Sequence, residues 1–479
     1  MMNRILILLL IMSLNGYGQQ GYQISISLNA YKGQQLYLGY HYGKLKALAD
    51  SAVADANGTV VFKGAKPLGG GIYFLVSPKK ELLFEMLVDK QQHFSVTGDS
   101  SKLNEIRFKG SKDNEDFQTY TGFVQERGKA IQQLQESLAR ASNKGDSAAI
   151  ETRIRELNKV IYQYRTDWIR QNPSSFLTTL FYALQEPEIP PANKHPRGVY
   201  DSTYAYHYFK GHYWDGISLA DDRLLRTPFF ENRLVRYYRE LVPPVPDSIK
   251  LEVDRMLLEA RPNKDIYKYL LNHFVQQYIN PTYMGQDAVF LHLFEQYINN
   301  HPEVDWYNEK SMKYITDRAY SLMANQLGQP AWDLVMVDST EKPSPLYEVN
   351  APLVVICFWD PTCSHCKEMV PHLDSLYQQK WKKQGVKLYG VMTEGGKANW
   401  IKYIKDNNLK DWIHVYQTEQ QREADYKAGK PSYRQLYDVY QTPVLYLLDE
   451  QKRIVAKKLS YQQLDELITR KLQQKSGTK

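Results

Sequence analysis

The stretch WDPTCSHC, residues 359–366, decides the fold of the C-terminal part of this chain. It follows an unbroken apolar run, Leu353–Trp359, which is short and rich in β-branched and aromatic residues and therefore predicts a buried strand. It leads into Cys366–Trp381, where apolar residues recur with the period of an amphipathic helix. The pattern places Cys363 where a buried strand gives way to the first turn of a helix.

That placement gives the two cysteines of the stretch different chemistry. At a helix start, unpaired backbone N–H groups and the positive end of the helix dipole stabilise the thiolate of Cys363, the species that attacks a disulfide. Cys366 lies one turn further and could attack the resulting mixed disulfide. Ser364 and His365 stand between them and are expected to tune the couple, since a protonated His365 would make it more oxidising. We therefore predict that Cys363 is the nucleophile and Cys366 the resolving thiol.

The residues around this stretch predict an α/β domain. A β-α-β arrangement that ends in a β-hairpin and a helix is typical of a thioredoxin fold. Cys357 lies inside the buried strand and is expected to be an inert core residue. The further elements expected are a strand at Val386–Met392, a helix at Ala398–Asn407, strands at Val444–Leu448 and Ile454–Lys458, and a helix at Tyr461–Leu472.

Residues 328–479 resemble the thioredoxin superfamily, and within it the TlpA/ResA-like extracytoplasmic thiol–disulfide oxidoreductases. The resemblance rests on Gly328–Leu334, Phe358-Trp359, the C-x-x-C motif, Pro371 and Thr442-Pro443. It implies exchange of disulfides with protein substrates, in the direction of a reductase or general oxidoreductase, and an upstream thiol as electron donor. It also implies that Thr442 and Pro443 belong to the substrate-binding site, with Pro443 in the cis form.

Three positions depart from the family pattern. Thioredoxins have a buried Asp where this chain has Cys357, and ResA-like reductases have a Glu where it has Met369, with Glu368 one position early. Thr362 replaces the usual Trp before the first cysteine. These departures and His365 leave oxidase or isomerase behaviour open.

The upstream two thirds of the chain predict two further domains. Short alternating runs between Gly21 and Gly98, separated by Asn57-Gly58 and Gly69–Gly71, are typical of a small antiparallel β-sandwich or barrel. From about Asp116 the apolar period becomes helical, first as an antiparallel hairpin and then in several helices, one of them expected to open at Asn172-Pro173.

These two regions resemble the β domain and the helical domain of uncharacterised thioredoxin-like secreted proteins of Bacteroidota, which bring no known activity. The stretches that carry this likeness are Leu82–Phe94, Asp222–Phe230 and Met284–Leu293. The expected domains are a β domain at 19–110, an α-helical domain at 111–327 and the thioredoxin-like domain at 328–479.

The N-terminus has the pattern of a secretory signal peptide, expected at residues 1–18. A basic start at Arg4 precedes the apolar run Ile5–Met12, and small residues at Gly16 and Gly18 flank a cleavage point before Gln19. The run is too short to span a bilayer, and no cysteine near the cleavage point could carry a lipoprotein anchor. We expect a periplasmic or otherwise extracytoplasmic protein without stable membrane insertion.

Composition narrows the remaining classes of function. The net charge of +7 is small for 479 residues and no long Lys/Arg block occurs, so nucleic acid is not expected as a partner. The three cysteines all fall within ten residues and cannot staple a scaffold, and a structural zinc site would need four ligands. Neither a metal nor a cofactor is expected. The alternative to an enzyme is an envelope binding or scaffold protein whose thioredoxin domain has weak or vestigial redox activity.

Overall fold

The computed structural model describes residues 21–141 and 143–477, so the expected signal peptide lies outside the described residues. The chain divides into two compact units. One runs to Pro243 and also takes in Leu258–Tyr267, and the other comprises Pro244–Leu257 and the chain from Lys268 onward. Within the described ranges, no helix is both long enough and apolar enough to cross a membrane.

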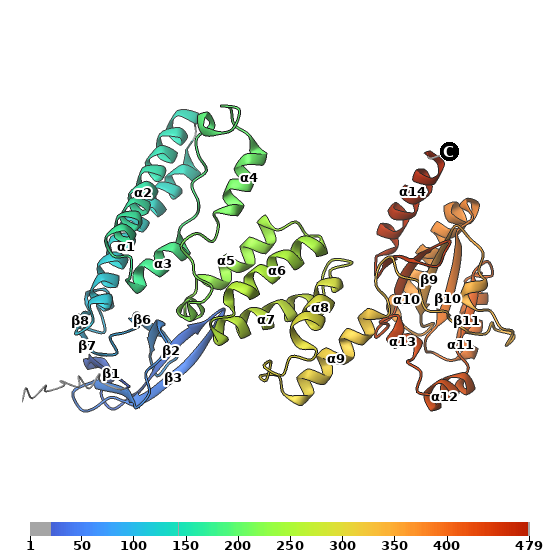
Figure 1. Ribbon diagram of the computed structural model, residues 1–479, viewed down its shortest axis with the longest axis horizontal. Coiled ribbons are helices and arrows are strands. Elements are labelled where there is room, and N and C mark those ends of the chain that lie inside the picture. The colour runs from blue at the N-terminus through green and yellow to red at the C-terminus, as the bar shows by residue number, and fades with distance from the viewer. Residues whose placement is uncertain (1–20, 142, 478–479) are drawn as a thin grey trace, which may run out of the picture. The chain divides into compact units, whose positions relative to one another are not determined.

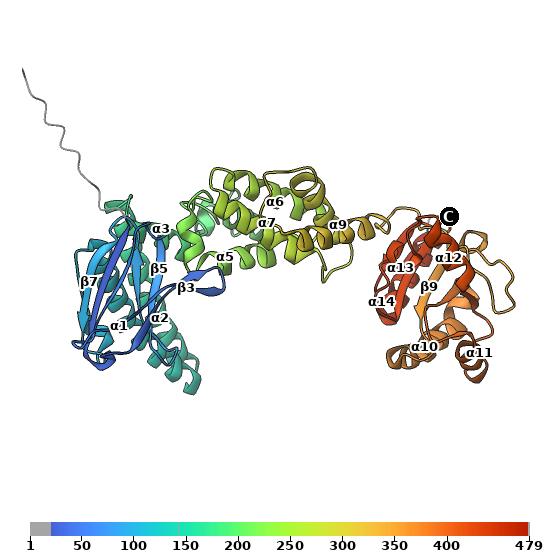
Figure 2. The same cartoon turned by 90° about the horizontal axis from the view of Figure 1, so that it is seen from below.

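The N-terminal region is a β-sandwich of two four-stranded sheets, with strand orders β4-β1-β7-β8 and β3-β2-β5-β6. Figure 2 shows β7 and β5 in separate layers. Apolar side chains of both sheets, such as Ile24, Leu38 and Val96, form one shared core. Strand β1 pairs parallel with β7, so the expectation of a wholly antiparallel arrangement is wrong at this pair. The strands are β1 (Tyr22–Leu28), β2 (Gln35–Tyr42), β3 (Leu45–Val53), β4 (Thr59–Gly64), β5 (Gly71–Val76), β6 (Leu82–Val88), β7 (His93–Gly98) and β8 (Arg107–Lys109).

A helical region follows the sandwich and begins with the predicted hairpin (Figure 1). The Asn143 side chain accepts a hydrogen bond from the Asp146 N–H and so caps the second helix of the hairpin. The next helix does not open at Asn172-Pro173, because Asn172 ends the preceding helix and the Ser175 hydroxyl accepts from the Leu177 N–H instead. The helices are α1 (Lys112–Arg140), α2 (Lys144–Gln171), α3 (Phe176–Leu184), α4 (Ser202–Gly211), α5 (Phe230–Arg236), α6 (Pro246–Ala260), α7 (Lys264–Tyr278), α8 (Asp287–Leu293) and α9 (Glu309–Met323).

The first helix is anchored on the sandwich by a buried side chain. Asn114 of α1 accepts a hydrogen bond from the backbone N–H of Leu87 in β6 and donates one to its carbonyl, both at 2.7 Å. Around this point Ile72 and Leu87 of the sheet pack against Tyr120 of α1 and Phe181 of α3. Because the amide satisfies both polar groups of one strand residue, it sets the position of α1 along β6.

The C-terminal region is a five-stranded sheet in the order β11-β10-β9-β12-β13. Strands β9, β10 and β11 are parallel, whereas β12 runs antiparallel to both β9 and β13. The all-β, α-helical and α/β parts of the predicted fold class are thus confirmed. The strands are β9 (Leu353–Trp359), β10 (Lys387–Met392), β11 (Ile413–Tyr416), β12 (Val444–Asp449) and β13 (Ile454–Lys457), and the helices are α10 (Ser364–Leu376), α11 (Lys397–Asp406), α12 (Glu419–Lys427), α13 (Tyr433–Leu436) and α14 (Tyr461–Gly477).

Alternate residues of β9 face opposite sides of this sheet, and both sides are buried. On one side, Val355 and Cys357 meet Val370 of α10, Trp400 of α11 and Ile468 of α14. The other side of β9 packs on the entry segment 331–351 and on the residues around α13. The sheet therefore holds the end of β9 firmly, and the cysteine motif begins directly after that end.

Candidate active site

A short loop carries the chain from Trp359, the last residue of β9, to Cys363, the N-cap of α10. The side chain of Asp360 shapes this loop, because its Oδ1 accepts hydrogen bonds from the N–H and the hydroxyl of Thr362, each at 2.7 Å. The Asp360 carbonyl accepts from the Cys363 N–H at 3.2 Å. Asp360 therefore fixes the turn that presents Cys363 at the start of the helix.

A second loop approaches this turn closely at Gly395. A Cβ atom at that position would lie 2.5 Å from Oδ1 of Asp360 and 2.9 Å from the Pro361 ring, and the residue has a φ of +89°. Both the space and the backbone conformation therefore require glycine.

Cys363 is the more acidic of the two motif thiols. Its partial burial raises the pKa, but hydrogen bonds from the backbone N–H of Cys366, from the Cys366 thiol, from Thr442 and from the backbone N–H of His365 outweigh that effect and leave the pKa below its ordinary value. In the neutral form, the Cys363 Sγ donates to the Thr442 carbonyl at 3.6 Å. The N-terminal turn of α10 thus stabilises the thiolate as the sequence pattern predicts.

Cys366 has the opposite character. Its side chain is only 1% exposed, and burial raises the pKa to about 12 although the Asp360 N–H donates to its Sγ at 3.4 Å. Hydrogen bonding to Cys363 and the negative charge of the Cys363 thiolate raise the pKa further. The second thiol is therefore protonated as long as the first is a free thiolate.

Cys357 is a fully buried thiol on β9, in the same apolar cluster as Cys366. Desolvation raises its pKa well above the ordinary value, and the nearby Cys366 thiolate adds to the effect. All three cysteines are free thiols. Cys357 is thus a core residue, as its place in the strand predicts, and supplies no acidic group next to Cys366.

The peptide bond between Thr442 and Pro443 is cis and lies beside the motif. The contact of the Thr442 carbonyl with Cys363 joins residues 79 positions apart in the chain. Both residues are partly exposed, and the buried strand β12 begins immediately after them. The structure therefore brings together four of the residues singled out from the sequence: Cys363, Cys366, Thr442 and Pro443.

The remaining motif side chains face solvent. Ser364 and His365 are both exposed, and it is the backbone N–H of His365 that acts on Cys363. Glu368 is exposed as well, whereas Met369 packs against the apolar cluster under the helix. Glu368 therefore does not reach the position that Met369 occupies.

Sequence reasoning missed three contributors to this site. Asp360 and Gly395 shape the loop through contacts that only the folded chain reveals, although a Gly-Gly pair at 395–396 after a predicted strand is a recognisable turn signal. The third is Tyr403 of α11, whose pKa burial raises, with a further rise from the charge of Cys366. Its ring lies 5.3 Å from that of Trp359, so it closes the apolar side of the site.

Across residues 21–141 and 143–477, no group of three or more His, Cys, Asp or Glu side chains is placed to hold a metal ion. The site consists of the Cys363 thiol with a lowered pKa at the helix start, the buried Cys366 thiol with a raised pKa one turn below it, and the adjoining carbonyl of Thr442. Such a pair can alternate between dithiol and disulfide and exchange with another disulfide.

Comparison with protein families divides the chain into three matches. Residues 351–454 match the thioredoxin-like family. Residues 22–117 and 125–320 match two families described as domains of unknown function, DUF4369 and DUF5106. A comparison with curated proteins found no match.

Several solved structures are similar to parts of the chain. A domain of a possible thiol-disulfide isomerase from Cytophaga hutchinsonii is 31% identical, with 32% of this chain and 97% of that one covered and a TM-score of 0.28. The thioredoxin domain of a thiol-disulfide oxidoreductase from Bacteroides vulgatus is 25% identical, with 30% and 97% covered and a TM-score of 0.27. A thioredoxin-like protein from Bacteroides caccae is 19% identical over 60% of this chain and 97% of that one, with a TM-score of 0.45.

Proposed function

We propose that this chain, whose residues 351–454 are thioredoxin-like, is an extracytoplasmic thiol–disulfide oxidoreductase that reduces disulfides of protein substrates through Cys363 and Cys366. The observation that carries the proposal is the asymmetry of the two thiols. Cys363 has a lowered pKa at the helix start, and Cys366 has a pKa of about 12 beneath it.

The reaction proceeds in two exchange steps. The Cys363 thiolate forms a bond to one sulfur of the substrate disulfide, and the other sulfur leaves as a thiolate. The Cys366 thiolate then attacks Cys363 Sγ, which forms the Cys363–Cys366 disulfide and releases the second substrate thiolate. Two electrons pass to the substrate, and an upstream thiol donor must return them to the pair.

The second step needs Cys366 to lose its proton. The contacts of Cys366 support a fall in its pKa at this stage of the reaction. Two of the effects that raise its pKa, the hydrogen bond to Cys363 and the charge of the Cys363 thiolate, disappear once Cys363 is covalently bonded to substrate. Formation of the mixed disulfide thus lowers the pKa of Cys366 when the resolving thiolate is needed.

Insulin reduction with dithiothreitol as donor tests the activity. We expect the wild-type protein to reduce insulin and Cys363→Ser to lose the activity. Cys366→Ser should instead trap a mixed disulfide on Cys363, and Cys357→Ala serves as the control that retains turnover. If the wild type neither reduces insulin nor yields a trapped species in the Cys366→Ser variant, the alternative of a binding or scaffold protein with vestigial redox activity is favoured.

The direction of electron flow is tested by a redox titration of the pair. The exposed side chain of His365 supports a potential near that of reducing thioredoxins, because water screens a charge on an exposed ring. We expect about −270 mV, and a shift of less than about 30 mV in His365→Gln. A value near −120 mV, typical of a strong oxidant, would reverse the proposed direction.

The proposed location rests on the pattern of residues 1–18, in which a basic start and an apolar run precede a cleavage point before Gln19. Fractionation of cells that express the full chain should recover a processed protein beginning near Gln19 outside the cytoplasm. Recovery of the unprocessed chain in the cytoplasm would contradict this part of the proposal.

A further inference from the structure

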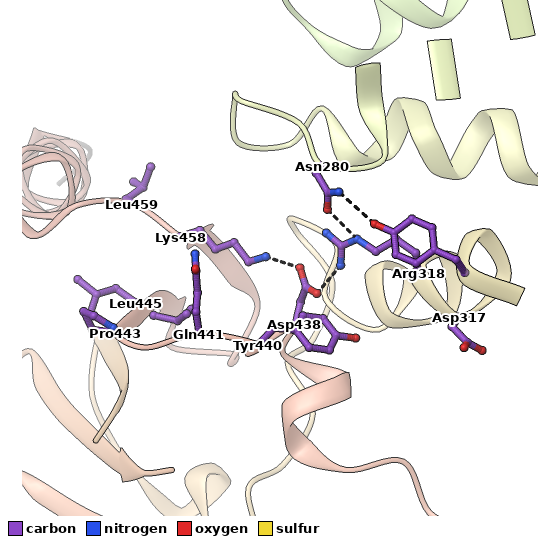
Figure 3. Close-up of a pocket in the computed structure, with 12 residues that line it drawn as sticks. Asn280, Asp317, Arg318, Asp438, Tyr440, Gln441, Pro443, Leu445, Lys458 and Leu459 are labelled. Carbon is purple, nitrogen blue, oxygen red and sulfur yellow. Dashed lines mark hydrogen bonds and ion pairs between the residues drawn. The ribbon is translucent and has the colours of Figure 1, made fainter. Parts of the chain in front are cut away.

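A cavity of about 650 Å³ opens beside Pro443. Its lining comes from two parts of the chain (Figure 3): Asn280, Tyr314 and Arg318 belong to the helical region, while Asp438 and Lys458 belong to the thioredoxin-like region. A volume between about 300 and 1,000 Å³ is typical of ligand sites. The cavity therefore has room for several side chains of a bound segment.

This cavity adjoins the redox site at Pro443. Pro443 lines the cavity, and the carbonyl of the preceding residue, Thr442, lies 3.6 Å from the Cys363 Sγ. Val444 and Leu445, the first residues of β12, extend the lining away from the thiol. A polypeptide whose cysteine sulfur reaches Cys363 thus has the cavity beside its flanking residues.

The helical wall is held in place by specific polar contacts. The Ser321 hydroxyl of α9 donates to the Gln435 carbonyl at 2.7 Å, and the Asn325 amide donates to the Leu436 carbonyl at 3.0 Å. Arg318 donates to the buried carboxylate of Asp438. Since these contacts involve backbone carbonyls and a buried ion pair, the wall is formed before any substrate binds.

Arg318 also fixes the loop at the far edge of the cavity. Its Nε donates to the carbonyl of Ile279 at 3.2 Å and to the side-chain oxygen of Asn280 at 3.1 Å. The amide of Asn280 donates in turn to the hydroxyl of Tyr314 at 3.2 Å. One guanidinium thus orders the loop, α9 and the thioredoxin-like region around the same space.

The cavity has an excess of positive charge. Arg318 and Lys458 both bond to the single carboxylate of Asp438, one to each oxygen, which leaves one positive charge unbalanced (Figure 3). The side chain of Lys458 is 43% exposed, so it remains accessible, and the acidic Asp317 at the rim is paired with Lys313 at 2.9 Å. A carboxylate on a bound segment would complete the charge balance at Lys458.

The space is also elongated. A second cavity of about 520 Å³ shares Asn280, Arg318, Asp438, Lys458 and Leu459 with the first. Its remaining lining includes Tyr283 and Met284, both of which are exposed. An extended segment fits two adjoining cavities better than a compact ligand does.

We propose that the loop at Asn280 and helix α9 form one wall of a substrate cleft, and that this cleft binds an extended segment of the protein substrate with an acidic side chain near its reactive cysteine. The inference rests on the proposed function and deepens it, because it names the segment that the redox site selects. It also gives the helical region a role: Tyr314, Arg318 and Lys458 determine specificity, while the chemistry stays with the thiols.

The test compares disulfide exchange with three substrates in the full-length protein. Two are peptides with the same cysteine disulfide, one with aspartates beside the cysteine and one with asparagines. The third is hydroxyethyl disulfide, which is too small to reach the cleft. We expect the wild type to prefer the aspartate peptide to the asparagine peptide about threefold to fivefold, as a partly exposed ion pair allows.

Two variants locate this preference. Lys458→Gln should abolish it, and Lys310→Gln, at an exposed position on α9, is the matched control that keeps it. Tyr314→Ala should lower the ratio of the peptide rate to the hydroxyethyl disulfide rate about fivefold. Tyr320→Ala is its control, because Tyr320 lies on the same helix with a similar exposure, 57% against 53%, but lines a different cavity.

The outcomes separate the two proposals. If the wild type reacts with none of the three substrates, the proposed oxidoreductase function fails. If it reacts with all of them, but without preference for aspartate or with the same rate ratios in Tyr314→Ala and Tyr320→Ala, the cleft is refuted while the redox function stands.

Discussion

The two motif thiols should differ greatly in their rate of alkylation by iodoacetamide at neutral pH. Burial raises the pKa of Cys366 from its ordinary 9.0 to about 12, whereas the pKa of Cys363 lies below 9.0. The two pKa values thus differ by about three units or more. At neutral pH the thiolate form of Cys363 is therefore about 1,000-fold more abundant than the thiolate form of Cys366. A more basic thiolate is intrinsically more nucleophilic, with a Brønsted coefficient of about 0.4–0.5. Over three pH units this makes the Cys366 thiolate about 16-fold to 32-fold more reactive than the Cys363 thiolate, which offsets part of the difference in abundance.

The net expectation is that Cys363 reacts at least about 30-fold faster than Cys366. The burial of Cys366, at 1% exposure, should widen this ratio because the reagent must reach the sulfur. The rate at Cys363 should reach half of its plateau below pH 9.0, because the pKa of this thiol lies below that value. The rate at Cys366 should still be rising at pH 10.

The assay alkylates the reduced protein for short times at a series of pH values and locates the label by fragmentation of the peptide that contains both residues. Cys357→Ala is the control and should change neither rate. In guanidinium chloride the three thiols should react at similar rates. Equal labelling of Cys363 and Cys366 in the folded protein, or labelling of Cys366 first, would refute the assigned roles.

Two further predictions concern buried charge. Burial lowers the pKa of His414 to about 4, although the hydrogen bond from its Nε2 to the Leu409 carbonyl acts in the opposite direction. The neutral ring therefore stabilises the fold fully above pH 6.5. About 3 kcal/mol of the free energy of unfolding is lost as the pH falls from 6.5 toward 4. In the His414→Gln variant, the free energy of unfolding measured in urea should therefore depend less on pH in this range. Asp287→Asn should cost about 3–5 kcal/mol in urea unfolding, because it leaves the buried ammonium of Lys457 without its carboxylate.

Both predictions have matched controls. His372→Gln, at an exposed histidine, should leave the pH dependence as it is in the wild type. Asp406→Asn breaks the exposed pair with Lys402 and should cost less than about 1 kcal/mol. If Asp287→Asn is no more harmful than Asp406→Asn, the buried pair does not hold the helical region to β13, and a slope unchanged in His414→Gln would assign the acid sensitivity to other groups.

The sequence predicted the elements whose apolar pattern is strong. The run Leu353–Trp359 is buried on both faces, and the hairpin helices keep their period over several turns, so both were recognised. Strand β11 was missed, because its four residues include His414, which reads as polar although it is largely buried among Trp359, Trp400 and Trp412. Burial of that kind depends on neighbours far away in the chain.

The edge strand β3 has a weak sequence signal for a different reason. Leu45 and Leu48 are exposed although apolar, so the strand has no clean alternation. At the candidate site, the spacing of Cys363 and Cys366 was enough to single out the two candidate thiols. The roles of Asp360 and Gly395 could not be foreseen, because they arise from a contact between loops 35 positions apart. Local pattern thus indicates the candidate thiols, and tertiary contacts decide how they are held.

The adjacent lysines at the end of β13 bear on where this protein can be divided. Lys457 bonds to Asp287 of α8 and to Asn325, which follows α9. Lys458 shares the carboxylate of Asp438 with Arg318 of α9. A fragment cut at residue 328, where the sequence resemblance begins, would lose Asp287 and Asn325, the partners of Lys457. Lys458 would keep Asp438, but Asp438 would lose Arg318. The domain delimited by sequence comparison is therefore shorter than the part of the chain that contains these ion pairs. A fragment that also includes α8 and α9 keeps both the Lys457–Asp287 and the Arg318–Asp438 pair.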